Sequence, residues 1–167
     1  MCVKAIKTGN FKIVNKIVTS DKNIIKETSG TIILTEAVKT NNLEMVCLLI
    51  DLGAKVNDEY RILYDHETPL AIAASQGNLE MVKLLVEAGA IVNIPLKYPE
   101  YWTPLMCGVS RNNFDVVKFL VEAGAAVNEI RDGGNFALAI AAHPNSQEIF
   151  NYLAPLTNIK LRKQLEN

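Results

Sequence analysis

The chain has few of the residues that build metal centres and disulfide frameworks. Its 167 residues include three cysteines, Cys2, Cys47 and Cys107, and two histidines, His66 and His143. A secreted disulfide framework or a zinc site needs paired or closely spaced cysteines, whereas these three are odd in number and far apart. We therefore expect free thiols in a reducing compartment, with no bound metal and no cofactor.

Long apolar runs and a strong net charge are also absent from the sequence. Residues 1–20 interrupt every apolar stretch with Lys, Asn or Thr, which excludes a signal-peptide core or a membrane span there. The net charge of -1 provides no strong attraction to nucleic acid or anionic lipid, and the basic cluster at residues 160–163 is too small for a nucleic-acid-binding face. We expect a cytoplasmic protein that binds neither nucleic acid nor membranes.

The most informative feature is a stretch of sequence that occurs twice. Residues 67–93 read ETPLAIAASQGNLEMVKLLVEAGAIVN, and residues 102–128 read WTPLMCGVSRNNFDVVKFLVEAGAAVN, an offset of 35 residues. Weaker copies begin at residues 1, 32 and 136. Repetition at such a period indicates a stack of similar structural units. We predict one domain, residues 1–167, made of five units at approximately 1–30, 31–62, 63–97, 98–130 and 131–160, followed by a short tail.

Each unit has the signals of two short helices. Thr68 before Pro69 predicts a helix start, because the threonine oxygen can cap free amides and proline is favoured at the first helical position. Gly77 and Gly89 are typical of helix ends, where a positive φ is often needed. In the second helix, apolar residues recur at helical spacing and predict one buried face: Leu79, Val82, Leu85 and Val86. Two such helices cannot enclose a core, so each unit must bury its neighbour.

The segments TPLAIAASQGN, TPLMCGVSRNN and EAGAxVN resemble the ankyrin repeat, and the resemblance spans roughly residues 1–155. It implies an all-α fold, an α-solenoid of five stacked helix-turn-helix units with β-hairpin-like finger loops and a concave surface that binds other proteins. The sequence departs from the family pattern after the TPL segment, where the usual histidine is replaced in four copies by Thr35, Ala71, Met106 and Ala139.

Two fingers are longer than the usual interval of this family and are rich in aromatic residues. Asn57 to Thr68 and Asn93 to Thr103 are 11 and 10 residues, whereas Asn128 to Phe136 is 8. Aromatic side chains with a polar end are favoured as binding anchors. The longer fingers hold Tyr60, Tyr64, Tyr98, Tyr101 and Trp102, which either contact a partner or pack one finger against another.

The resemblance also places four polar residues at the ends of inner helices, facing the groove: Ser75, Gln76, Ser110 and Arg111. Arg111 is the one cation among them, and arginine is favoured at binding hot spots. Together with the aromatic residues they form the predicted partner-binding set.

These observations predict a non-catalytic protein-protein interaction module, an adaptor or inhibitor that acts as a monomer on a partner protein. Two alternatives remain at this point. One is a structural or self-associating scaffold with no separate partner. The other is a hydrolase-type enzyme that uses Cys107 and His66, for which the sequence offers no orienting group or oxyanion site.

Overall fold

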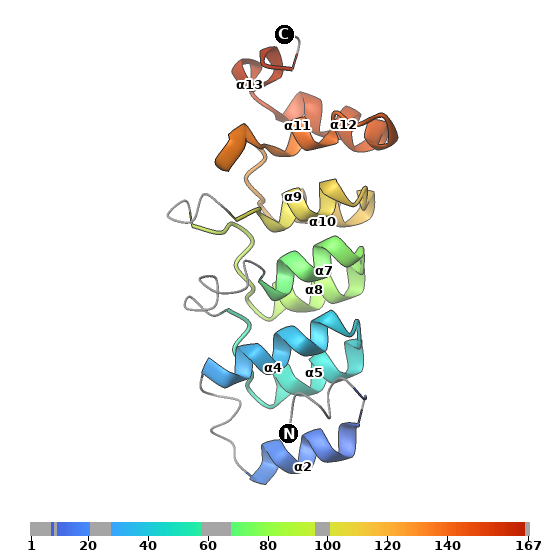
Figure 1. Cartoon of the computed structure of the whole chain (residues 1–167), viewed down its shortest axis with the longest axis vertical. Coiled ribbons are helices and arrows are strands. Elements are labelled where there is room, and N and C mark those ends of the chain that lie inside the picture. Colours follow the sequence, from blue (N-terminus) through green and yellow to red (C-terminus); the bar gives the residue numbers. More distant parts are fainter. Residues whose placement is uncertain (1–7, 9, 21–27, 58–67, 96–100, 166–167) are drawn as a thin grey trace. The chain divides into compact units, whose positions relative to one another are not determined.

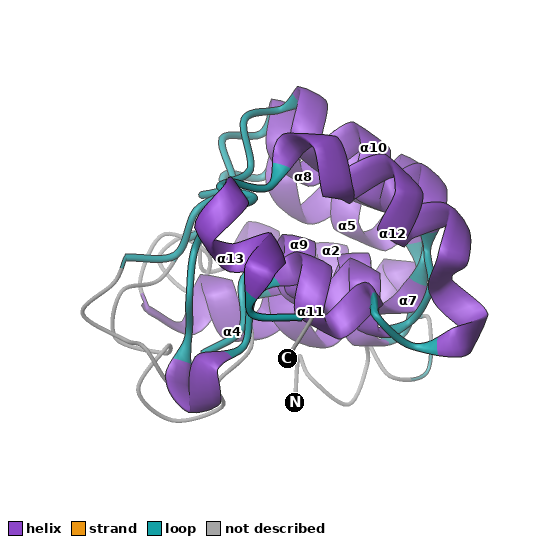
Figure 2. Ribbon diagram, turned by 90° about the horizontal axis from the view of Figure 1, so that it is seen from above, coloured by secondary structure: helices purple, strands orange, loops and turns teal. Residues whose placement is uncertain are grey.

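The computed structural model describes residues 8, 10–20, 28–57, 68–95 and 101–165. Within these ranges the regular structure consists of α-helices and short 3₁₀ turns, and the one β feature is an isolated antiparallel bridge between Arg131 and Asn135. Figure 2 likewise shows helices and loops in the described segments. The predicted all-α repeat fold is confirmed. In the described residues, the hairpin character expected of the fingers is limited to that single bridge.

The chain divides into two compact units: residues 1–73 with 80–90, and residues 74–79 with 91–167. The first contains α2 (Phe11–Ser20), α4 (Thr28–Lys39) and α5 (Leu43–Asp51), which are labelled in Figure 1. The second contains α9 (Pro104–Ser110), α10 (Phe114–Glu122), α11 (Ala137–Ala141), α12 (Gln147–Leu153) and α13 (Ile159–Lys163). Two further helices, α7 (Pro69–Gln76) and α8 (Leu79–Glu87), are divided between the units. The five-unit, single-domain division stays a prediction.

Side-chain caps fix the starts of several helices. The backbone amide of Ala71 donates to Thr68 Oγ1 at 3.1 Å, and that of Met106 donates to Thr103 Oγ1 at 3.2 Å. Each bond satisfies one of the amides that a first helical turn leaves without an intrahelical partner. The prediction that each Thr-Pro pair starts a helix is therefore confirmed.

The second helices α5, α8 and α10 end in the same turn. After α5, the amide of Gly53 donates to Ile50 O at 2.8 Å and that of Ala54 donates to Leu49 O at 2.9 Å. This pair of bonds is the Schellman motif, which needs a residue with positive φ at its centre. The glycines at this place have φ values of 89° and recur at residues 53, 89 and 124. The sequence repeat is thus a repeat of backbone geometry.

The buried face of the second helices is displaced slightly from the predicted one. In α8 the buried residues are Met81, Val82 and Leu85, whereas Leu79 and Val86 are only half-buried. A helix buries most deeply the side chains at the centre of its apolar stripe, and Leu79 and Val86 lie at its edges. The same spacing recurs in α5 and α10, where the buried residues are Met45, Val46, Leu49, Val116, Val117 and Leu120.

Asparagine side chains join successive repeats within each unit. In the first unit, Asn57 Nδ2 donates to Gly89 O at 2.8 Å. In the second unit, Asn93 Nδ2 donates to Gly124 O at 2.9 Å, and Asn93 Oδ1 accepts from the amide of Ala126 at 2.8 Å. Asn128 makes the corresponding bonds to residues 156 and 158. The closing Asn of the sequence repeat therefore binds the backbone of the following turn, and we call these bonds the asparagine contacts.

Candidate functional site

The nine predicted site residues divide into those that the structure describes and those that it does not. Three of them, Tyr60, Tyr64 and Tyr98, lie outside the described residues and stay predictions. The six others, Ser75, Gln76, Tyr101, Trp102, Ser110 and Arg111, all belong to the second unit. The candidate site is therefore built from this unit alone.

The aromatic pair at the start of α9 has one buried and one exposed member. Tyr101 is 3% exposed and the following Thr103 is 2% exposed, whereas Trp102 between them is 37% exposed. Tyr101 therefore follows the packing alternative and offers almost no surface to a partner, contrary to its place in the predicted set. Trp102 is held between two buried neighbours, which limits its backbone freedom while part of its ring faces solvent.

The predicted inner-helix residues occupy the C-terminal ends of α7 and α9. Gln76 and Ser110 are the last residues of these helices and Arg111 is the C-cap of α9; all three are exposed, and Ser75 is half-buried. Ser110 Oγ donates to Cys107 O at 2.9 Å. Trp102 and Arg111 flank the seven-residue α9, so about 10 Å of helix separates them at 1.5 Å per residue. The site thus has an aromatic end and a polar end.

His143, which the predicted set omitted, occupies the position equivalent to Ser110 in the next repeat. It lies 33 residues after Ser110, the same offset that relates Phe136 to Thr103, and it is exposed before the 3₁₀ turn Pro144–Ser146. The repeat frame alone could have found it. We therefore add His143 to the polar end of the candidate site.

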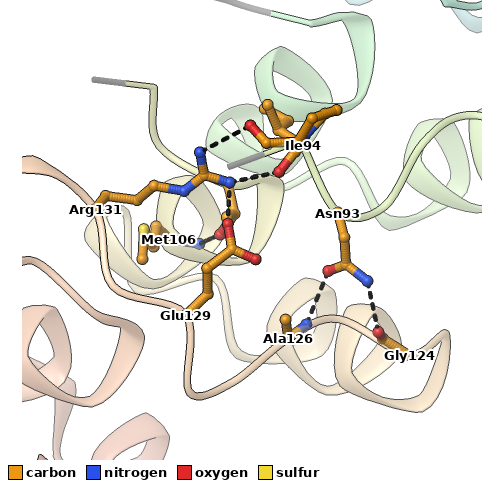
Figure 3. A network of polar contacts seen from close by, with 9 residues as sticks. Asn93, Ile94, Met106, Gly124, Ala126, Glu129 and Arg131 are labelled. Atoms are coloured by element: carbon orange, nitrogen blue, oxygen red, sulfur yellow. Dashed lines mark hydrogen bonds and ion pairs between the residues drawn. The ribbon is translucent and has the colours of Figure 1, made fainter. Parts of the chain in front are cut away.

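A buried arginine in the last finger was also missed. Arg131 is 2% exposed, and its Nη2 donates to Ile94 O at 2.6 Å and to a carboxylate oxygen of Glu129. Its Nη1 lies 3.5 Å from Pro95 O. Figure 3 shows this side chain reaching from the loop before α11 toward Ile94. An arginine in a finger is ordinarily expected at the surface, so no signal in the sequence marked it as buried.

An edge-to-face aromatic contact lies on the second helices of the same unit. The rings of Phe114 and Tyr152 are 5.6 Å apart between centroids with an interplanar angle of 83°. Burial of the Tyr152 hydroxyl, and secondarily the carboxylate of Glu122, raise the pKa of Tyr152 above its ordinary value of 10.0. Tyr152 is therefore a neutral packing residue at physiological pH.

The described residues contain no arrangement suited to metal chemistry. Across the part of the chain that the structure describes, no group of three or more His, Cys, Asp or Glu side chains could hold a metal ion. Cys47 and Cys107 are free thiols and half-buried, whereas Cys2 and His66 lie outside the described residues. Over the same residues, no helix combines the length and apolar character that crossing a bilayer requires.

A comparison with curated protein sequences gave no match, whereas a comparison with family models did. A family model described as ankyrin repeats, in three copies, matches residues 2–95 and again residues 91–164. Proteins of this family are generally protein-protein interaction modules and typically have no catalytic activity. The capped helix pairs, the repeated glycine turns and this match over nearly the whole chain establish that the protein belongs to the ankyrin-repeat family.

Proposed function

We propose that the protein is a non-catalytic recognition module that binds one partner protein through the surface running from Trp102 to the inner-helix ends of the second unit. It acts by occupancy, as an adaptor or an inhibitor, in the cytoplasm and as a monomer. The polar end of the surface consists of Ser75, Gln76, Ser110, Arg111 and His143, of which Ser75 is half-buried. Tyr60, Tyr64 and Tyr98, which lie outside the described residues, stay predicted contacts of the same partner.

The observation that carries this proposal is the partial exposure of Trp102 on a buried base. A tryptophan that is 37% exposed between neighbours at 3% and 2% has already lost most of its backbone freedom. A partner that covers it gains a large apolar contact at little further entropic cost, which is how aromatic anchors act at interfaces. Exposed polar residues nearby fit the polar rim that surrounds such anchors.

The proposal is tested by substitution of Trp102 in the whole chain. The partner is first identified by affinity purification from the native source with mass spectrometry, and binding of the purified partner is then measured by titration calorimetry. Trp102→Ala should weaken binding by about 2 kcal/mol, or roughly 30-fold in Kd, the scale of a hot-spot residue. Lys118→Ala, an exposed position on α10, is the matched control and should leave Kd unchanged.

The competing functions give different results in the same experiments. If Trp102 serves only finger packing, Trp102→Ala lowers the free energy of unfolding and leaves Kd within about twofold. A self-associating scaffold elutes as a stable oligomer in size-exclusion chromatography with light scattering, and Trp102→Ala dissociates it. An enzyme shows turnover that is lost in Cys107→Ser or His66→Gln. Any of these results contradicts the proposal.

A further inference from the structure

The buried guanidinium of Arg131 joins two parts of the second unit that are distant in sequence. It donates to Ile94 O at 2.6 Å and is within 3.5 Å of Pro95 O, 37 and 36 residues earlier. The same group pairs with the carboxylate of Glu129, whose side chain is 10% exposed. The Arg131 side chain itself is completely excluded from solvent.

A cation in this position is retained only if its contacts replace the water that it loses. Burying a charge is costly unless the charge is paired and hydrogen-bonded. Glu129 supplies the countercharge, and the two backbone carbonyls accept from the planar fork of donors that distinguishes arginine from lysine. The backbone of Ile94 and Pro95 is therefore a required acceptor for Arg131, and its position is coupled to that of the arginine.

The arginine is itself held in a defined loop. Its backbone amide donates to Asn135 O at 2.8 Å, and its carbonyl accepts from the amide of Gly134 at 3.1 Å. The loop leads into Phe136, which is 3% exposed and directly precedes α11, and α11 packs against α9. The loop of Arg131 thus contacts Ile94–Pro95 and leads into α11, which packs against α9, the helix that begins two residues after Trp102.

We propose that Arg131 is a positioning residue: it fixes the backbone at Ile94–Pro95 and, through the loop that leads into α11 and the packing of α11 against α9, the start of α9 where Trp102 lies. The consequence for binding rests on the proposed function, because it assumes that the surface at Trp102 is the one a partner recognises. The positioning itself is a property of the free protein. Asn93 directly precedes the segment that Arg131 holds, and its own side chain is bonded to Gly124 and Ala126 (Figure 3).

The test compares Arg131→Met with Lys160→Met in the free full-length chain. Methionine keeps the approximate length of the side chain and removes every donor, and Lys160 is an exposed cation on α13 of the same unit, outside the candidate site. Hydrogen exchange is measured by mass spectrometry, and the accessibility of Trp102, the sole tryptophan, is measured by acrylamide quenching.

Arg131→Met should accelerate exchange at residues 91–95 and 101–103 by at least about tenfold while α10 keeps its protection, because local opening changes without global unfolding. Quenching of Trp102 should rise about twofold, since a freer base exposes more of the ring. Arg131→Lys, which keeps the charge without the fork, should fall between wild type and Arg131→Met. Lys160→Met should match wild type in both measurements.

Two results overturn the proposal. One is unchanged exchange at residues 91–95 and 101–103 and unchanged quenching in a folded Arg131→Met variant. The other is uniform acceleration across the second unit, which indicates that Arg131 contributes only to overall stability. If Arg131→Met does not fold, Glu129→Gln replaces it: a local effect of the same kind supports the proposal, and a uniform or absent effect overturns it. No partner is used in this experiment, so a negative result does not contradict the proposed function. In the same way, a normal Kd for Trp102→Ala in the binding assay does not contradict the positioning of Ile94–Pro95 by Arg131.

Discussion

Replacing Gly77 by alanine tests how the turn after α7 is fitted to the start of α10. Gly77 has a φ of +74°, and a Cβ built on it would lie 2.6 Å from Oδ1 and 2.9 Å from Cγ of Asn113. The corresponding turns contain Asn41 and Asn112, with φ values of 56° and 58°. The backbone at this turn therefore accepts a side chain elsewhere in the chain. At residue 77 the space that a side chain needs is taken by Asn113.

The expected loss has two parts. An alanine in the left-handed region costs about 1–2 kcal/mol. Asn113 must also move, which breaks its bonds from Nδ2 to Ala74 O at 2.8 Å and to Ser75 O at 3.2 Å, each contributing about 0.5–1.5 kcal/mol. Gly77→Ala should therefore lower the free energy of unfolding by about 2–5 kcal/mol in total.

Gly134→Ala is the matched control for this substitution. Gly134 lies in the same unit with a φ of +73°, and nothing is within 4 Å of its built Cβ, so only the conformational cost of about 1–2 kcal/mol applies. Urea unfolding followed by circular dichroism measures both variants. In the double mutant Gly77→Ala, Asn113→Ala, the cost of the glycine substitution should fall to the control value. Equal costs for Gly77→Ala and Gly134→Ala, or additive costs in the double mutant, would show that Asn113 does not obstruct a side chain at residue 77.

Three further outcomes are expected. Gly108→Ala should stabilise the protein by about 0.5–1 kcal/mol in thermal unfolding, because a helical glycine is replaced and the new Cβ meets two valine side chains at 3.4 and 3.5 Å, ordinary contact distances; a lowered Tm would contradict this. Asn93→Ala should cost about 1–3 kcal/mol in urea unfolding for its two bonds to the following turn, and an unchanged midpoint would show that water replaces them. The pKa of Tyr152 is raised by burial and by Glu122, so its stabilising contribution should be intact below pH 10.0 and lost as the pH rises through the folded-state pKa, because the unfolded chain loses the proton first. An ultraviolet titration of wild type against Tyr152→Phe checks the direction, and a Tyr152 transition below that of the other tyrosines would be inconsistent with it.

The sequence was sufficient wherever structure is determined locally. Thr68 and Thr103 cap α7 and α9, as predicted. Gly53, Gly89 and Gly124 end α5, α8 and α10, also as predicted. These features depend on a few consecutive residues and on φ preferences, which a repeated sequence shows directly. The family and the all-α fold follow from the same signals.

The candidate site was harder to predict because burial is decided by neighbours that are distant in sequence. Tyr101 and Trp102 are adjacent and both aromatic, yet their exposures are 3% and 37%. Asn42 and Asn113 occupy the same place in the repeat. Asn42 caps its helix by accepting from the amide of Met45 at 2.9 Å, whereas Asn113 makes no such bond and reaches back to the end of α7. No local signal distinguishes the two residues of either pair. The exposure of each aromatic residue and the bonding of each asparagine depend on the space that another repeat leaves.

The asparagine contacts have a consequence for how such a chain changes during evolution. Asn93 binds a carbonyl and the amide two residues later, at Gly124 and Ala126, and Asn128 binds the same two kinds of atom at Leu156 and Asn158. The receiving atoms belong to the backbone, so any side chains that permit the turn can supply them. Repeats can therefore be duplicated, lost or diverge in sequence while the joint between them is inherited unchanged, and the fingers are free to acquire new aromatic and charged residues for new partners.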